Sequence, residues 1–490
     1  MPALRSGRFL KRALLLLSAL PLFAACAPPR EAALAITHVT VIDMTGAPPR
    51  SDQTVVIVKQ RVVDLGPSAS TAIPRGAQTI DATRKFLIPG LVDMHVHLTA
   101  AGEPDGSRKF MIPLLLANGI TSVRDMGSYL DSIFPLRTEI ADGKRLGPQI
   151  ITPGPYLDGS RPSFQPSLVV TNAAEASQDV HQLVARGVDF IKVQSVLSRD
   201  AYFAIAQAAQ REHVVFVGHV PDRVTAAEAA DAGQYSIEHL TNVLRGCSHD
   251  EEKLMREQFQ TAPKNETPNQ AQARFVRWQQ EILGSYSQEQ AAVLLEKFRE
   301  KDVWQTPTLV LLQNDAFPTL ENAATSDDRA KYIPTRTLNT WKESRAAQTK
   351  GISAQDSQLH TQLMQESMLI VGKMQKAGVH ILAGTDSPAP YVFPGSSLHD
   401  ELQLLVQAGL TPTEALQSAT SHPAEFLHTT KDAGTIERGK YADLVILDAN
   451  PIGDIRNTRK INAVILRGKL LDRAMLNQLI ADELSFAPTH

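Results

Sequence analysis

The sequence predicts an α/β fold, a (β/α)8 TIM-like barrel with a small β-sandwich domain built from the N- and C-terminal segments. Between residues 90 and 429, short apolar runs alternate with stretches of helical periodicity, which is typical of a parallel barrel. Both ends of the chain instead contain β-rich runs separated by glycine and proline turns. A chain of 490 residues can hold a barrel of about 250 residues and a second domain.

The β-sandwich domain is expected to combine residues 34–89 with residues 430–475. Runs with strand character occur at residues 36–42, 54–63, 444–447 and 463–466. Because these two segments resemble each other and enclose the barrel sequence, we expect them to complete one sheet.

Eight apolar runs of the barrel sequence are interpreted as strands, at residues 92–97, 122–125, 149–152, 190–193, 214–219, 236–239, 304–312 and 379–386. Two excursions, at about residues 241–303 and 313–378, have helical spacing and are expected to be helical insertions. Their periodic apolar residues, such as Met364, Val371 and Met374, are expected to pack in the core. The insertions are also candidates for a lid or for the contact of a homo-oligomer.

Metal-ligand residue types stand where these predicted strands end: His95, His97, Lys192, His219, His239 and Asp386. The carboxyl ends of parallel barrel strands meet on one face, and side chains two apart on a strand point the same way. Imidazole and carboxylate are ordinary zinc ligands. A His-x-His pair alone is more often two half-buried histidines, and Asp386 alone more often a turn residue. The whole set instead favours one shared metal site.

Three stretches resemble the amidohydrolase superfamily, in its imidazolonepropionase-related and prolidase-like branch: PGLVDMHVH at 89–97, GTDS at 384–387 and GTIERGKYADLV at 434–445. The resemblance implies two divalent metal ions, with zinc expected. It also implies a carboxylated Lys192 that bridges them. The ligands it implies are His95, His97, Lys192 and Asp386 for the first ion, and Lys192, His219 and His239 for the second. An unmodified Lys192 in a barrel ion pair is the alternative.

Such a site predicts hydrolysis of a non-cyclic amide bond by a metal-bridged hydroxide, with Asp386 as general base and acid. Dipeptides or N-acyl amino acids are the expected substrates. Many prolidase-like relatives have a tyrosine two residues after the fifth-strand histidine, where this chain has Pro221, so a preference for proline stays open. The alternatives are a mononuclear cyclic-amide hydrolase or deaminase, similar to imidazolonepropionase, and a non-catalytic lipid-anchored binding protein.

Four further residues are candidates for substrate contact. Arg124 ends the second predicted strand and could pair with a substrate carboxylate, although a salt bridge to Asp93 or Asp125 explains it equally well. The other three candidates are Tyr156, Asp158 and His399.

Residues 1–25 are expected to form a signal peptide, because basic residues up to Arg12 precede an apolar run too short to span a bilayer. The run ends in LFAAC and resembles a bacterial lipobox, which predicts lipidation of Cys26, a tether at 26–33 and a periplasmic or outer-membrane lipoprotein. A freely secreted protein is the alternative. The net charge of −3, without a basic run, argues against a nucleic-acid partner. Membrane contact is expected only through Cys26.

Overall fold

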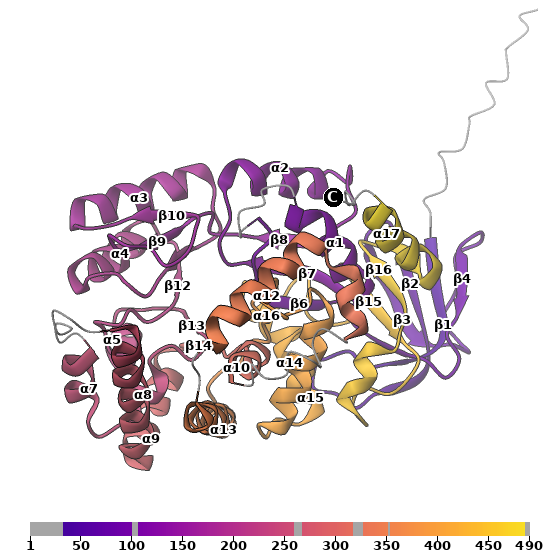
Figure 1. Cartoon of the computed structure of the whole chain (residues 1–490). Helices are drawn as coiled ribbons and strands as arrows, with labels where there is room; N and C mark the ends of the chain where they lie inside the picture. Colours follow the sequence, from indigo (N-terminus) through magenta and orange to yellow (C-terminus); the bar gives the residue numbers. More distant parts are fainter. Residues whose placement is uncertain (1–32, 100–105, 259–266, 317–326, 351–352, 486–490) are drawn as a thin grey trace, which may run out of the picture.

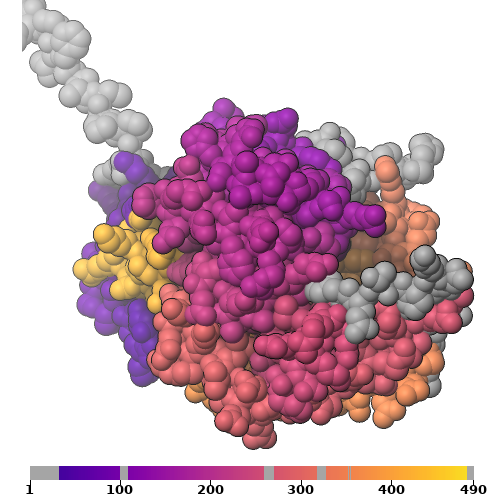
Figure 2. Space-filling view, turned by 90° about the vertical axis from the view of Figure 1, so that its left-hand side faces the viewer, coloured from indigo at the N-terminus to yellow at the C-terminus, as the bar shows by residue number. Residues whose placement is uncertain are grey.

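The computed structural model describes residues 33–99, 106–258, 267–316, 327–350 and 353–485. The predicted signal peptide, most of the tether and Cys26 lie outside the described residues. In the described part, strands from both ends of the chain form one mixed sheet, and most other strands form two parallel sheets. The indigo and yellow segments of the two chain ends lie side by side in both views (Figures 1 and 2).

The terminal sheet has eight strands, in the order β17-β16-β15-β5-β1-β2-β3, with β4 paired to β1. Strand β15 pairs antiparallel with β5, which places Leu444 opposite Pro89, whereas β1 runs parallel to β4 and β5. Side chains of the sheet's own strands, including Ile36, Val55 and Ile465, form one buried apolar cluster. Its strands are β1 (Ala33–Val41), β2 (Arg50–Val58), β3 (Arg61–Pro67), β4 (Gln78–Asp81), β5 (Phe86–Pro89), β15 (Leu444–Leu447), β16 (Ile461–Leu466) and β17 (Lys469–Asp472).

The parallel strands fall into a three-stranded sheet, β6-β7-β8, and a six-stranded sheet, β10-β9-β11-β12-β13-β14. Strands β9 and β10 were not among the predicted runs. The strands are β6 (Leu91–Val96), β7 (Ile120–Asp125), β8 (Gln149–Ile151), β9 (Tyr156–Asp158), β10 (Ser167–Val169), β11 (Ile191–Val193), β12 (Phe216–Gly218), β13 (Ser236–Glu238) and β14 (Trp304–Thr306).

The last predicted strand, residues 379–386, is not a named strand of the described chain. Ile381 forms an isolated parallel bridge with Gln305, and Ser387, one residue beyond the predicted strand, forms one with Val96. This stretch therefore runs between β14 of one sheet and β6 of the other. On the opposite side, the amide of Asp189 donates to the carbonyl of Thr152 at 2.9 Å, which joins the segments after β8 and before β11.

The predicted strand at residues 304–312 was too long. Strand β14 ends at Thr306, and residues Leu309–Ala316 form helix α10. Pro307 has no amide hydrogen for a sheet ladder, and Thr308 adopts a positive φ of 47°. A short, continuously apolar run does not distinguish a buried strand from a buried helix, so periodicity alone could not find this boundary.

The helices follow the strands and cover the sheets (Figure 1). In the second insertion, Met364, Val371 and Met374 are buried, which confirms their predicted packing role. The helices are α1 (Gly106–Ala117), α2 (Leu130–Ala141), α3 (Ala173–Arg186), α4 (Arg199–Arg211), α5 (Ala226–Asp231), α6 (Val243–Gly246), α7 (Glu251–Gln258), α8 (Pro268–Gly284), α9 (Gln288–Glu300), α10, η2 (Asp328–Tyr332), α12 (Thr335–Thr349), α13 (Ala354–Ala377), α14 (Ser396–Gln407), α15 (Pro412–Ser418), α16 (Ser421–Phe426), η3 (Ile455–Arg459) and α17 (Arg473–Ser485).

Among the described residues, the helices are too short or too polar to span a bilayer.

Candidate metal centre

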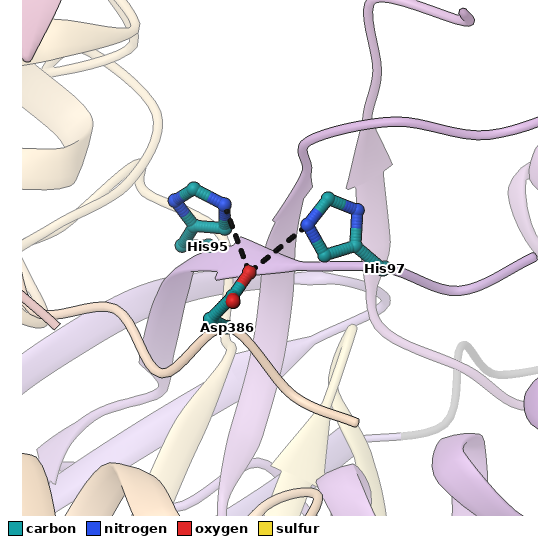
Figure 3. A group of neighbouring side chains, drawn as sticks. All are labelled: His95, His97 and Asp386. Carbon is teal, nitrogen blue, oxygen red and sulfur yellow. Dashed lines mark ion pairs between the residues drawn. The ribbon is translucent and has the colours of Figure 1, made fainter. Parts of the chain in front are cut away.

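Three potential ligands meet at the end of β6. The Oδ1 atom of Asp386 lies 3.2 Å from Nε2 of His95 and 3.0 Å from Nε2 of His97 (Figure 3). Both histidines belong to the stretch that forms β6 and its end. Asp386 directly precedes Ser387, which forms an isolated parallel bridge with Val96 of β6. The ligand atoms of these residues lie within 4.8 Å of one another. This spacing suits a shared cation.

The other two histidines extend this group. The ring of His239 lies 4.4 Å from that of His95, and the ring of His219 lies 5.0 Å from that of His239, centroid to centroid. His219 directly follows β12 and His239 directly follows β13. The four imidazoles therefore form a continuous group at the carboxyl ends of three parallel strands.

The Nδ1 atom of each histidine has a partner in the protein. Nδ1 of His95 lies 2.9 Å from Glu238, that of His97 3.1 Å from the Tyr156 hydroxyl, that of His219 2.8 Å from Ser195 and that of His239 2.7 Å from Thr308. Such partners fix the ring orientation of metal-binding histidines and leave Nε2 available for the ion.

Lys192, in the middle of β11, is fully buried beside this group. Its Nζ atom has no hydrogen-bond partner among the described residues. Gly218 makes room for its stem, since a Cβ there would lie 3.1 Å from Cδ of Lys192 and 2.2 Å from the carbonyl oxygen of Val193. A buried, unpartnered ammonium group is costly, so burial lowers the pKa of Lys192 to about 8.

Burial also favours the neutral form of three of the histidines. It lowers the pKa of His239 to about 3, lowers the pKa of His95 and holds the pKa of His219 well below its usual value. Burial alone would raise the pKa of Asp386, but its interactions with His239, His95 and His97 hold that pKa well below the usual value. Neutral imidazoles and an ionised carboxylate are the forms that bind divalent metals, so the donor set fits such an ion.

Two of these residues adopt an uncommon backbone conformation. His239 has a φ of 57° and Asp386 a φ of 66°, which place both in the left-handed region. Backbone hydrogen bonds hold them there, from His239 to Thr306 at 2.9 Å and from Asp386 to His95 at 2.8 Å. Strain of this kind concentrates at functional sites.

Arg124 is paired within the protein. It is fully buried beneath His95, and its guanidinium group donates to Glu238 at 2.8 and 2.9 Å, to Ser236 and to Thr306. The internal salt bridge is therefore the better interpretation, although its partner is Glu238 rather than Asp93 or Asp125. Reasoning from the sequence missed Glu238. The available signal was an acidic residue in a buried strand directly before His239.

The other three candidate substrate contacts lie in different surroundings. Tyr156 lies at the site, where its hydroxyl contacts His97. Asp158 is buried and accepts hydrogen bonds from the backbone amides of Gly159 and Val196, so it organises the loops. His399 is buried away from this group, with Nδ1 3.0 Å from the hydroxyl of Thr458.

The fold and this donor set define a class, the α/β proteins with a clustered histidine and carboxylate site at the ends of parallel strands. The model of the amidohydrolase family matches residues 86–283 and 330–471, well over half of the chain. The protein belongs to the amidohydrolase family.

Curated relatives match only a short part of the chain. Imidazolonepropionase from Streptococcus gordonii is 36% identical over 95 residues, which cover 18% of this chain and 29% of that protein. A dihydroorotase from Trichlorobacter lovleyi is 46% identical over 48 residues, or 10% of this chain and 11% of that enzyme. The matched stretches thus span less than a third of these relatives.

Solved structures match almost the whole chain. A prolidase candidate from Bifidobacterium longum is 25% identical, with a TM-score of 0.64 over 92% of this chain and 99% of the other. Bottromycin amidohydrolase has a TM-score of 0.71 at 20% identity, over 92% and 90% of the two chains. A Xaa-Pro dipeptidase with bound methionine has a TM-score of 0.63 at 19% identity, over 90% and 100%. At 19–20% identity, the likeness shows a shared fold.

Proposed function

We propose that this protein is a metal-dependent hydrolase that cleaves a non-cyclic amide bond, in dipeptides or N-acyl amino acids. The observation that carries the proposal is the convergence of four histidines, an ionised Asp386 and an unpartnered Lys192 at one end of the parallel strands. Family membership supports the reaction class, and the prolidase-like neighbours support the substrate class.

The residues fit two divalent ions, with zinc as the proposed metal. His95, His97, Lys192 and Asp386 would hold one ion, and Lys192, His219 and His239 the other. Carboxylation of Lys192 would turn an unfavourable buried cation into an anionic bridge. Its pKa of about 8 leaves part of the amine neutral near pH 7, and the neutral amine is the form that reacts with carbon dioxide.

When bound, divalent ions in such a site lower the pKa of water and polarise the substrate carbonyl. Asp386 is ionised at neutral pH because its pKa is well below the usual value. Its carboxylate can therefore accept a proton from the attacking water and pass that proton to the leaving nitrogen. The four imidazoles keep their orientation during the reaction because each is held through Nδ1, by Glu238, Tyr156, Ser195 or Thr308.

We also propose the finer architecture that the sequence suggested. Residues 90–429 would form the closed barrel, and the bridges made by residues 379–387 with β14 and β6 support closure. Residues 34–89 and 430–475 would form the β-sandwich domain, which the eight-stranded terminal sheet supports.

Export and lipidation at Cys26 complete the proposal, with a periplasmic or outer-membrane location. If Cys26 carries the lipid, wild-type protein should sediment with membranes and Cys26→Ser should not. Acyl labelling retained in the variant would reject the lipobox and leave the secreted alternative.

One alternative function is supported by a specific observation. The imidazolonepropionase match favours a mononuclear cyclic-amide hydrolase or deaminase in which Lys192 is unmodified. Metal content distinguishes the two, since the proposal requires two equivalents of zinc per chain.

The deciding experiment is a screen of dipeptides and N-acyl amino acids with the zinc-loaded protein, scored by release of amine. We expect turnover of at least one such class and two bound metal equivalents. One equivalent, with turnover of cyclic amides only, would contradict the proposal. Two bound equivalents of zinc without turnover of any amide would favour the non-catalytic binding protein.

A further inference from the structure

A pocket of about 360 Å³ lies between α8, α10, α12 and α13, in the part of the chain formed by the two helical insertions. Apolar side chains such as Phe275, Leu312 and Met364 form its walls. The pocket is distinct from the metal-ligand group, and none of the proposed ligands lines it.

Helix α10 connects the pocket to the candidate metal centre. The hydroxyl of Thr308, directly before α10, contacts Nδ1 of His239. Asp315 lies seven residues further along, which corresponds to about 10 Å at 1.5 Å per residue. Asn314 also donates to the carbonyl of Tyr391, in the segment that follows Asp386. The charge of Asp386 also acts on Asp315, which places the pocket within electrostatic reach of the candidate metal centre.

The polar groups of the pocket favour a donor or a cation. Asp315 lies exposed on the pocket wall, where partial desolvation by the surrounding protein raises its pKa to about 6 and the charge of Asp386 adds to this effect. It therefore remains mostly ionised at neutral pH. The Oε1 atom of Gln279 and the Nδ1 atom of His360, both buried, have no hydrogen-bond partner among the described residues. A carboxylate and an amide oxygen select a group that donates hydrogen bonds.

The positive charge that acts on Asp315 belongs to Arg345, whose guanidinium group contacts other residues. Arg345 is buried, donates to the carbonyl of Asn314 at 2.6 Å and lies over the ring of Tyr391. Its charge lowers the pKa of Asp315, while its printed hydrogen bond goes to the backbone carbonyl of Asn314 rather than to the carboxylate of Asp315. Asp315 thus keeps its acceptor atoms for a ligand.

We infer that this pocket is the side-chain specificity site of the enzyme, and that it takes a substrate residue with a long alkyl stem and a terminal cation. The inference rests on the proposed amide hydrolysis and names the substrate class within it. The apolar walls accommodate the methylene groups, as they do for the stems of lysine and arginine. The carboxylate of Asp315 would form a charge-assisted hydrogen bond with the cationic head. An acidic side chain would be repelled.

The test uses alanine-containing dipeptides with lysine, norleucine or glutamate on either side of the scissile bond. Norleucine has the alkyl stem of lysine without the ammonium group. In the zinc-loaded wild type, we expect kcat/KM for the preferred lysine peptide to exceed that for norleucine by about tenfold or more, the usual size of a charged hydrogen bond. Asp315→Asn should abolish this preference, so that the lysine and norleucine peptides have similar kcat/KM values. Asp328→Asn, an exposed aspartate in η2 outside the pocket, is the matched control and should retain it.

A binding measurement separates this inference from the proposed function. Calorimetry with n-pentylamine should show binding that Asp315→Asn weakens and Asp328→Asn does not, whereas n-pentanol should bind both variants equally. Peptide hydrolysis with an unchanged lysine preference in Asp315→Asn, or a preference for glutamate, would overturn the pocket assignment alone. Absent hydrolysis with Asp315-dependent pentylamine binding would overturn the proposed reaction and keep the cation site.

Discussion

Replacing Glu238 with glutamine tests the support beneath the candidate metal centre. Glu238 is fully buried, accepts two contacts from Arg124 and contacts Nδ1 of His95 at 2.9 Å. Glu238→Gln keeps the side-chain shape but leaves the Arg124 guanidinium buried without its countercharge. Breaking a buried pair in this way costs about 3–5 kcal/mol of unfolding free energy.

The same substitution should weaken metal binding. A neutral amide is a poorer partner than a carboxylate for the Nδ1–H group of His95, so the imidazole becomes a weaker ligand. Loss of such a partner lowers metal affinity by about 10- to 100-fold. Chemical denaturation measures the first effect, and zinc titration against a competing chelator measures the second.

The double variant Arg124→Met/Glu238→Gln separates the two effects. Removing the guanidinium as well eliminates the unpaired buried charge, so part of the stability should return while zinc affinity stays low. An unfolding free energy of Glu238→Gln equal to that of the wild type, or unchanged zinc affinity, would refute the idea that Glu238 supports both Arg124 and His95.

Two further substitutions test other parts of the site, and a third tests a buried carboxyl group of helix α14. Asp386→Asn should lose about 10²-fold or more in turnover with little change in the melting transition, and near-normal turnover with metal bound would remove Asp386 from the mechanism. Lys192→Ala should bind fewer than two equivalents of zinc and be nearly inactive, and short-chain carboxylates should restore some activity; a structure with one ion and an unmodified Lys192 turned away from it would contradict the bridge. Glu401 is buried and accepts from the amide of Val310 at 2.7 Å, and burial raises its pKa to about 8. Since its pKa is higher in the folded than in the unfolded chain, the folded state binds the extra proton, and stability should fall as pH rises from the unfolded value of 4.5 toward 8. In the Glu401→Gln variant, the denaturation midpoint should depend less on pH across this interval. An unchanged slope would mean that another group causes the pH dependence.

Local pattern was enough to predict much of this arrangement. Strand alternation predicts that His95 and His97 share a face, and their Nε2 atoms both approach Asp386. The β-rich runs at the two ends likewise form one sheet. Helical spacing predicted the buried face of α13, including Met364 and Met374. Each of these features depends on the periodicity of neighbouring residues, which can be read directly from the order of amino acids.

Contacts between distant residues were decided only by the tertiary structure. The pairing of Arg124 with Glu238 joins residues 114 positions apart, and the contact of His97 with Tyr156 joins residues 59 positions apart. The sequence by itself determined which residue types stand at the strand ends, because short-range periodicity controls which way each side chain points. Tertiary packing alone decided that Glu238 compensates the buried charge of Arg124 and that Asp315 lies on a pocket wall. Both features depend on the groups that surround each side chain after the chain has folded.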